Sequence, residues 1–179
     1  MTDAFDEAEG PRQALLLLRH AKSSWPDGVD DHERPLAPRG VRAAELVGRF
    51  LARNGLLPDQ VVCSTARRAM DTCAGVLAGA AASVPGLVAP PVRFDGRVYD
   101  DDVLGPAAEV LAALPADGRV LVVGHEPGLV RAITRLCGAE VRLPTAGLVW
   151  LEPAGRPGAA CLRLLVPPRL LAAFTDTAH

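Results

Sequence analysis

Apolar residues along this chain come in two patterns that alternate from one end to the other. Short uninterrupted apolar runs, of which 15–18 and 120–123 are the clearest, are typical of strands buried on both faces. Between them lie longer segments in which apolar side chains recur at helical spacing, as Leu46 and Phe50 do in 38–54. The pattern predicts strands at 14–18, 60–63, 92–94 and 119–123, and helices at 38–54, 65–82, 102–114 and 127–137.

This alternation indicates an α/β fold, a three-layer sandwich in which helices cover both faces of a mostly parallel central sheet. Two further strand-like runs, 148–151 and 161–166, have no helical segment between them and predict an antiparallel pair that closes the sheet. We expect a single domain over 14–179, preceded by a mobile N-terminal tail at 1–13.

The composition agrees with one domain and argues against several classes of partner. Hydrophobic residues make up 49% of the 179 residues, which is enough for a sizeable core. The net charge of −2 favours neither nucleic acid nor an anionic membrane as a partner, and no apolar run is long enough to span a bilayer. The acidic start of the chain lacks the pattern of a secretory signal peptide, so we expect a cytoplasmic protein.

Metal-binding patterns are not apparent in the sequence. The cysteines are far apart and form no Cys-x-x-Cys pair, so we expect buried thiols and no structural zinc site. His32 lies among charged residues in 30–34, where it is expected to be exposed to solvent, and the spacing matches no standard set of metal ligands. We expect neither a metal nor a cofactor.

Polar residues with related chemistry follow three of the predicted strands. Arg19 and His20 come directly after the first strand, the stretch 64–68 with its two arginines follows the second, and His125 follows the strand at 119–123. The carboxyl ends of neighbouring parallel strands meet at one edge of a sheet, where α/β proteins bind their ligands. The sequence therefore predicts a pocket that gathers two histidines and at least two arginines.

These residue types suit the transfer of a phosphoryl group. An arginine has a permanent charge and a planar set of donors that matches phosphate oxygens. A neutral imidazole can attack phosphorus if nearby arginines lower its pKa and its second nitrogen donates to a carbonyl, which fixes the tautomer. A second histidine can donate to the phosphoryl oxygens, and Ser64 can either cap the following helix or bind phosphate.

Four ordered segments of the chain resemble the histidine phosphatase superfamily, which has the phosphoglycerate mutase-like fold. They are Arg19-His20-Ala21-Lys22, the stretch 31–40 with its Arg34-Pro35-Leu36, the stretch 64–72, and Val123-Gly124-His125-Glu126-Pro127. The resemblance extends over about 14–166. The short chain and the Lys-Ser-Ser-Trp sequence after His20 are similar to the phosphohistidine phosphatase branch of that superfamily.

The resemblance implies a role for each matching residue. His20 would be the nucleophile that becomes phosphohistidine, and Arg19 and Arg67 would bind the phosphoryl oxygens. His125 would be the second histidine of the pocket, whereas Arg68 is expected to point away from it more often than Arg67. Further contacts with the substrate are expected from Lys22, Arg34 and Ser64.

One part of the superfamily's pattern is missing. Many members have a glutamate or aspartate that protonates the leaving group, but Gly96 and Arg97 occupy the positions where it is expected. Asp95 and Asp100 are the nearest candidates, although a run of aspartates is typical of a solvated helix start. Because imidazole leaves far more readily than an alcohol, a site without a strong acid suits phosphohistidine or another activated phosphate.

We therefore expect a metal-independent phosphatase that forms a phosphohistidine on His20 and removes phosphate from phosphohistidine in a protein or from a similar activated phosphate. The alternatives are a small-molecule phosphomonoesterase and a phosphate-binding module without turnover. The partner would accordingly be a phosphorylated protein or a small phosphorylated substrate. The size is compatible with a monomer, and the sequence leaves the oligomeric state open.

Overall fold

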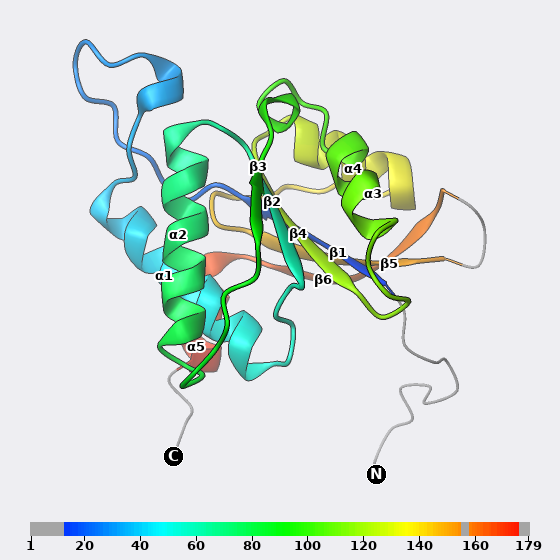
Figure 1. Ribbon diagram of the computed structural model, residues 1–179. Coiled ribbons are helices and arrows are strands. Elements are labelled where there is room, and N and C mark those ends of the chain that lie inside the picture. The colour runs from blue at the N-terminus through cyan, green and yellow to red at the C-terminus, as the bar shows by residue number, and fades with distance from the viewer. Residues whose placement is uncertain (1–12, 155–157, 176–179) are drawn as a thin grey trace.

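The centre of the structure is a six-stranded sheet (Figure 1). The computed structural model describes residues 13–154 and 158–175. The strands are β1 (Ala14–Arg19), β2 (Gln60–Cys63), β3 (Val92–Phe94), β4 (Arg119–Gly124), β5 (Leu148–Pro153) and β6 (Ala160–Val166). Their order in the sheet is β3-β2-β4-β1-β5-β6. The neighbours from β3 to β1 pair in parallel, whereas β5 is antiparallel to both β1 and β6.

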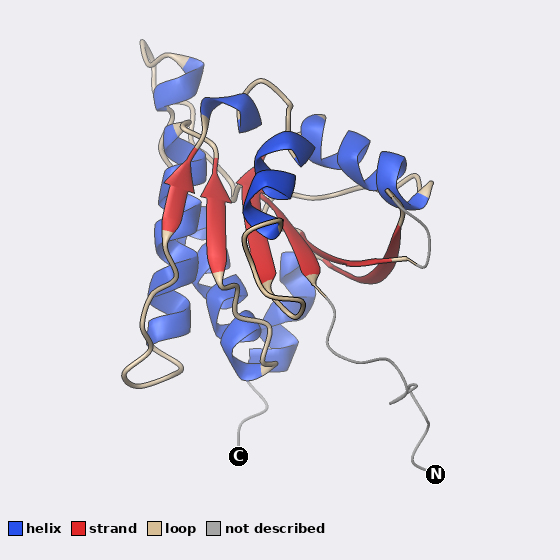
Figure 2. Ribbon diagram, turned by 45° about the vertical axis from the view of Figure 1, so that its right-hand side comes forward, coloured by secondary structure: helices blue, strands red, loops and turns tan. Residues whose placement is uncertain are grey.

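Helices cover both faces of this sheet (Figure 2), which confirms the predicted fold class. One face packs against α1 (Pro38–Arg53), α2 (Arg67–Ala81) and α5 (Pro168–Thr175). The other face packs against α3 (Leu104–Leu111) and α4 (Gly128–Cys137). Two short 3₁₀ helices, η1 (Asp31–Glu33) and η2 (Gly96–Val98), lie in the connections.

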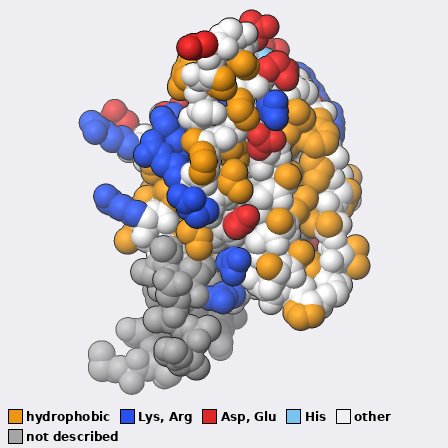
Figure 3. Space-filling model, turned by 90° about the vertical axis from the view of Figure 1, so that its left-hand side faces the viewer, with side chains coloured by type: hydrophobic (Ala, Val, Ile, Leu, Met, Phe, Trp, Pro, Cys, Tyr) orange, Lys and Arg blue, Asp and Glu red, His pale blue; other side chains and the backbone are white. Residues whose placement is uncertain are grey.

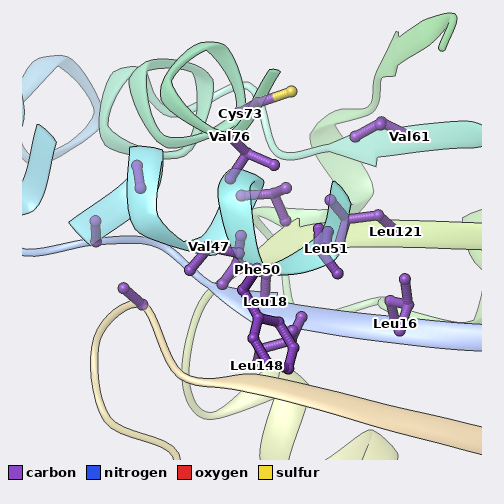
Figure 4. Close-up of a cluster of buried hydrophobic side chains, with 14 of the residues drawn as sticks. Leu16, Leu18, Val47, Phe50, Leu51, Val61, Cys73, Val76, Leu121 and Leu148 are labelled. Atoms are coloured by element: carbon purple, nitrogen blue, oxygen red, sulfur yellow. The ribbon is translucent and has the colours of Figure 1, made fainter. Parts of the chain in front are cut away.

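The apolar run in β1 serves both layers of the core, because successive side chains of a strand point to opposite faces. Leu16 and Leu18 belong to the cluster under α1 and α2, where Phe50 and Leu51 pack beside them (Figure 4). Leu17 belongs to the cluster on the opposite face. Each of these leucines is fully buried and contributes about 1.5–3 kcal/mol to folding. The end of β1, and with it the site, is thereby fixed from both sides.

A close backbone approach fixes the segment that follows His20. The amide of Ala37 donates to the carbonyl of Lys22 at 2.8 Å, immediately before α1. A Cβ atom at Gly40 would lie 2.2 Å from that carbonyl oxygen, so only glycine allows α1 to pack this closely. The first turn of α1 therefore supports the loop that follows His20.

The elements follow the sequence-based predictions closely in the sheet and less closely in the helices. The strands β2 and β3 have the predicted bounds, and the antiparallel pair β5–β6 is confirmed. Helix α3 is shorter than predicted and begins at Leu104, because the Asp102 carboxylate accepts the Gly105 amide at 2.9 Å and occupies the turn before it. Helix α5 was not predicted; it begins at Pro168, and proline suits the first turn of a helix.

Two further predictions concern the tail and the thiols. Residues 1–12 of the predicted tail lie outside the described residues, whereas the Gln13 amide donates to the Leu111 carbonyl at 2.8 Å. Cys63 and Cys73 are buried as expected, but Cys161 on β6 is exposed.

Figure 3 shows a face on which Lys and Arg side chains gather along one side. Within the described ranges no helix is long and apolar enough to cross a membrane.

Candidate active site

The ends of three adjacent strands bring the predicted residues together. β4 lies between β2 and β1, and their final residues are in register, with Cys63 opposite Val123 and Arg19 opposite Gly124. The amide of His20 donates to the Gly124 carbonyl at 2.9 Å. The imidazole rings of His20 and His125 consequently lie with their centroids 5.0 Å apart. The predicted clustering of both histidines at the carboxyl edge of the sheet is observed.

His20 has the tautomer that a nucleophile needs. Its Nδ1 lies 2.8 Å from the Ala21 carbonyl, which can only accept, so Nδ1 has the hydrogen. Burial, followed by the charges of Arg68, Arg19 and Arg34, lowers the pKa of His20 to about 4. At neutral pH the ring is therefore uncharged, and Nε2 has a free lone pair.

His125 is held by the end of the neighbouring strand. Its Nε2 lies 2.8 Å from the hydroxyl of Ser64, which is itself fully buried. Burial, followed by the neighbouring His20 and by Arg68, lowers the pKa of His125 to about 3. The Ser64 hydroxyl also accepts the Ala66 amide at 3.3 Å, so Ser64 is bonded to both His125 and the start of α2.

The two arginines at the start of α2 are placed the other way round from the prediction: Arg68, and not Arg67, is buried beside the histidines. The Arg67 side chain is 53% exposed and lies 3.9 Å from Asp71. Arg68 is buried: its guanidinium lies 3.0 Å from the Asp31 carboxylate and donates to the Asp31 carbonyl at 2.6 Å. Beside the effect of burial, the charge of Arg68 lowers the pKa of both site histidines. The expectation that Arg67 faces the pocket is corrected to Arg68.

The helix register explains this reversal. α2 begins at Arg67, so Arg68 shares its inward face with Ala69, Thr72 and Val76, all of which are buried. Thr72 on this face accepts the Ala21 amide at 2.9 Å, next to His20. Arg67 lies off this face. The apolar stripe of α2 is visible in the sequence and was the signal that could have identified Arg68.

Arg19 lies on the opposite side of His20 from α2. Its Nη1 lies 2.7 Å from the Glu126 carboxylate and donates to the Leu143 carbonyl at 2.8 Å. Glu126 follows His125 directly in the sequence, but the resemblance implies no role for it. An open groove of about 830 Å³ adjoins this ion pair, with Leu143 and Pro167 among its apolar walls.

The expected rim contacts are not all available to a substrate. The nitrogens of Arg34 donate to Asp31 at 2.7 Å, to Ser23 at 2.5 Å and to the Ser24 carbonyl at 3.2 Å, and its guanidinium stacks on Trp25. With each of its nitrogens engaged, Arg34 acts on the site through its charge, and the expected direct contact is not supported. Lys22 is half-buried, and its carbonyl accepts the Ala37 amide; within 13–154 and 158–175 its side chain has no hydrogen bond or ion pair.

Unsatisfied donors surround His20. Among the described residues, the buried side-chain nitrogens without a hydrogen-bond partner include Nε of Arg19, Nε of Arg68 and Nδ1 of His125. Leaving such groups buried and unpaired costs about 1–3 kcal/mol each. A fourth such nitrogen, Nε1 of Trp150, lies on β5, whereas these three belong to side chains around His20 and together can bind an anion with several oxygens.

The candidates for a general acid are engaged elsewhere or exposed. Asp95 accepts from Arg97 at 2.7 Å and from Arg93 at 2.9 Å, and both arginines also pair with Glu109. Hydrogen bonds from Arg97 lower the pKa of Asp95 to about 2, so this carboxyl has no proton to donate at neutral pH. We name this group of four residues the Asp95 cluster. Asp100 is exposed, and among the described residues its side chain has no hydrogen bond or ion pair with the site.

The turn at 31–33 lies beside the site, although its sequence suggested only a solvent-exposed loop. Asp31, His32 and Glu33 in η1 form what we name the Asp31 turn. The ring of Tyr99 connects it to the histidines, with centroid distances of 5.0 Å to His32 and 5.5 Å to His125. No local sequence pattern predicts that this turn lies at the site, because its position depends on contacts with residues distant in the chain. The described residues contain no group of three or more His, Cys, Asp or Glu placed to hold a metal ion.

Comparisons with known proteins agree with this geometry. A model of the histidine phosphatase superfamily (branch 1) matches residues 15–86. An uncharacterized protein of Mycobacterium tuberculosis is 37% identical over 161 residues, covering 81% of this chain and 96% of that protein.

Solved structures match over most of the chain as well. A candidate phosphohistidine phosphatase SixA from Nakamurella multipartitia is 36% identical, with a TM-score of 0.64 over 87% of this chain and 96% of that one. A mycobacterial glucosyl-3-phosphoglycerate phosphatase is 19% identical, with a TM-score of 0.60 over 84% of this chain and 97% of that one, and shares the fold.

Proposed function

Because the chain belongs to the histidine phosphatase superfamily, we propose that it hydrolyses phosphorylated substrates through a phosphohistidine on His20. The observation that carries this proposal is the group of buried donors without partners on Arg19, Arg68 and His125. The oxygens of a phosphoryl group accept several hydrogen bonds and bear the negative charge that two guanidiniums match. A bound phosphoryl group therefore satisfies donors that the folded protein leaves unpaired.

The first step uses the free lone pair of His20. Nε2 attacks phosphorus in line with the departing group, while the Ala21 carbonyl holds the Nδ1 hydrogen at 2.8 Å. Ser64 accepts the Ala66 amide and can give its own hydrogen to Nε2 of His125. Neutral His125 then has its hydrogen on Nδ1, which donates to a phosphoryl oxygen during transfer.

The second step returns the enzyme to its starting state. Water attacks the phosphorus of phospho-His20, the nitrogen–phosphorus bond breaks, and its electron pair returns to Nε2. Arg19 and Arg68 bind the phosphoryl oxygens in both steps, so charge neutralisation comes from guanidiniums and the proposed reaction needs no metal ion.

We favour phosphohistidine in a protein as the substrate. The Asp95 carboxylate is bound to arginines, and imidazole leaves with less help from an acid than an alcohol does. The groove of about 830 Å³ beside Arg19 has room for the polypeptide that flanks a phosphorylated residue. A relative that is 36% identical is named as a candidate phosphohistidine phosphatase.

Trapping the intermediate tests the proposal. The protein is incubated with ³²P-labelled p-nitrophenyl phosphate and quenched, and the label is assayed for the stability to alkali and lability to acid of phosphohistidine. We expect this label in the wild type and in Arg67→Ala, whose side chain lies outside the pocket. His20→Ala should show none. A wild type that binds phosphate but never becomes labelled would instead be a binding module.

The substrate is tested separately. A phosphohistidine peptide, sugar phosphates and nucleotides are compared at matched concentration, and we expect the highest kcat/KM for the peptide. A higher value for a sugar phosphate would contradict the substrate assignment while leaving the phospho-His20 intermediate intact.

A further inference from the structure

His32 lies at the mouth of the phosphoryl pocket. Its ring contacts Tyr99 edge-on at 5.0 Å, and Tyr99 in turn contacts His125. Its Nε2 lies 3.1 Å from the hydroxyl of Thr65, the residue directly after the Ser64 that holds His125. The His32 side chain is 38% exposed, so a bound substrate can reach it.

The direction of attack determines where a proton donor has to be. In an in-line displacement the departing atom lies on the side of phosphorus opposite Nε2 of His20. Since His20 is buried at the strand ends, the departing atom faces the open mouth of the pocket. A proton donor for the leaving group therefore belongs on the rim.

The groups of the Asp31 turn and Tyr99 differ in their ability to donate a proton there. A hydrogen bond from Arg34, helped by the charge of Arg68, lowers the pKa of Asp31, which is therefore an acceptor at neutral pH. The Tyr99 hydroxyl donates to Asp31 at 3.2 Å. His32 remains, and histidine is the side chain that exchanges protons most readily near neutral pH.

The partners of His32 suit both of its protonation states. The Glu33 carboxylate lies 2.9 Å from Nδ1 and can only accept, so Nδ1 keeps its hydrogen. This carboxylate also stabilises the imidazolium, as an acid partner does for a catalytic histidine. The Thr65 hydroxyl can accept a hydrogen from Nε2 or donate one to it, so Nε2 can lose and regain its proton.

We propose that His32 is the general acid of this site and gives the enzyme a second activity, the hydrolysis of phosphate monoesters of alcohols. The inference rests on the proposed phospho-His20 reaction and extends it to poorer leaving groups. As the bond between phosphorus and the ester oxygen breaks, its electron pair stays on that oxygen, which takes the hydrogen from Nε2 of His32. The products are the alcohol, phospho-His20 and neutral His32.

The second half of the cycle restores the proton. Neutral His32 accepts a hydrogen from the water molecule that attacks phospho-His20, and inorganic phosphate is released. His32 thus ends protonated and His20 ends neutral, as both began. Glu33 and Thr65 are positioning residues in this scheme, because their side chains bond to the His32 ring and act through it.

The experiment measures kcat/KM for 2,4-dinitrophenyl, p-nitrophenyl, phenyl and simple alkyl phosphates with the wild type and His32→Gln. This parameter reports only the steps up to departure of the leaving group. We expect His32→Gln to lose about 10²-fold or more with the alkyl phosphate and to change by less than about 3-fold with 2,4-dinitrophenyl phosphate. Retained activity on the latter shows that the variant is folded.

Two other variants complete the test. His20→Ala should abolish activity on every substrate, and Glu33→Gln should show a weaker form of the His32→Gln pattern. An equal loss of His32→Gln on all four substrates would make His32 a structural residue and overturn the inference, as would a wild type that turns over aryl but no alkyl phosphates. Absence of any phosphoenzyme in the wild type would instead remove the underlying phosphatase proposal.

Discussion

The Asp31 turn and the Asp95 cluster both hold carboxylates against arginines, but they differ in the burial of those arginines. The side chains of Arg34 and Arg68, which pair with Asp31, are each 8% exposed. Those of Arg93 and Arg97, which pair with Asp95, are 40% and 43% exposed. Water screens the second group, whereas the first acts on the buried histidines across a poorly screened distance.

This difference shows that the number of ion pairs is a poor guide to function. The Asp95 cluster has more salt bridges, yet none of its members is among the main causes that shift the pKa of His20 or His125. Arg68, paired with Asp31, lowers both. The chemistry therefore depends on which charges lie with the histidines in the protein interior, and each prediction below tests that distinction.

Removal of one arginine from each region should have the largest effect. Arg68→Ala deletes a buried donor of the phosphoryl pocket, and we expect kcat/KM for p-nitrophenyl phosphate to fall by about 10²–10³-fold. Arg97→Ala deletes a solvent-screened partner of Asp95 and should cost less than about 3-fold. Arg67→Ala is the matched neighbour of Arg68 and should behave like Arg97→Ala. Equal losses of kcat/KM in Arg68→Ala and Arg67→Ala would show that the buried arginine contributes no more to the reaction than its exposed neighbour.

Acid should destabilise the two regions in different pH windows. Burial lowers the pKa of His20 to about 4 from 6.5, so the unfolded chain binds a proton that the folded chain excludes. The free energy of unfolding therefore falls as pH drops from about 6.5 to about 4, by about 1.4 kcal/mol per pH unit for each such histidine. Asp95, with its pKa near 2, gives stability that is complete above its ordinary value of 3.8 and is lost below it.

Urea unfolding between pH 7 and pH 4 measures this difference. His20→Asn removes one of the two buried histidines, and the slope of stability against pH should become about half as steep, with His125 supplying the rest. Asp95→Asn should leave the slope unchanged over the same range. An unaltered slope in His20→Asn would show that His20 titrates normally in the folded protein.

The parts of the site built on strand ends could be predicted from the sequence. The apolar runs before Arg19, Ser64 and His125 identify parallel strands, and parallel strands have a common carboxyl edge. The prediction for Arg67 and Arg68 was wrong because it rested on the resemblance and not on the buried face of the helix, which Ala69, Thr72 and Val76 define. Adjacent residues of a helix point about 100° apart, so only one of the two arginines can lie on that face.

The Asp31 turn could not be predicted in the same way. Its charged residues match any solvated loop, and its place at the pocket depends on contacts with Tyr99, Thr65 and Arg68 from other parts of the chain. Such tertiary contacts leave no periodic trace in a local stretch of sequence. The sequence directed attention to Asp95 instead, because it lies next to the position where the superfamily has its acid; its partners Arg93 and Arg97 are two residues away on either side.

Neutralising the carboxylates should destabilise the buried region more than the exposed one. Asp31→Asn weakens the pairing of two buried guanidiniums, and we expect a loss of about 1–2 kcal/mol, or about 5 °C in Tm. Glu109→Gln affects only exposed arginines and should leave Tm unchanged in the same thermal scan. A comparable fall in Glu109→Gln would mean that burial of the arginines does not decide the strength of these pairs.

The smallest expected effect concerns the acid that the sequence pointed to. Asp95 accepts from Nε of Arg97 at 3.0 Å, from Nη2 of Arg97 at 2.7 Å and from Arg93 at 2.9 Å. A carboxylate bound in this way has no proton at neutral pH, so Asp95→Asn should change kcat/KM by less than about 2-fold for aryl and alkyl phosphates alike. A selective loss with the alkyl phosphate would identify Asp95 as the proton donor and transfer to it the role proposed for His32. If only His32→Gln shows that selectivity, the proton comes from the Asp31 turn.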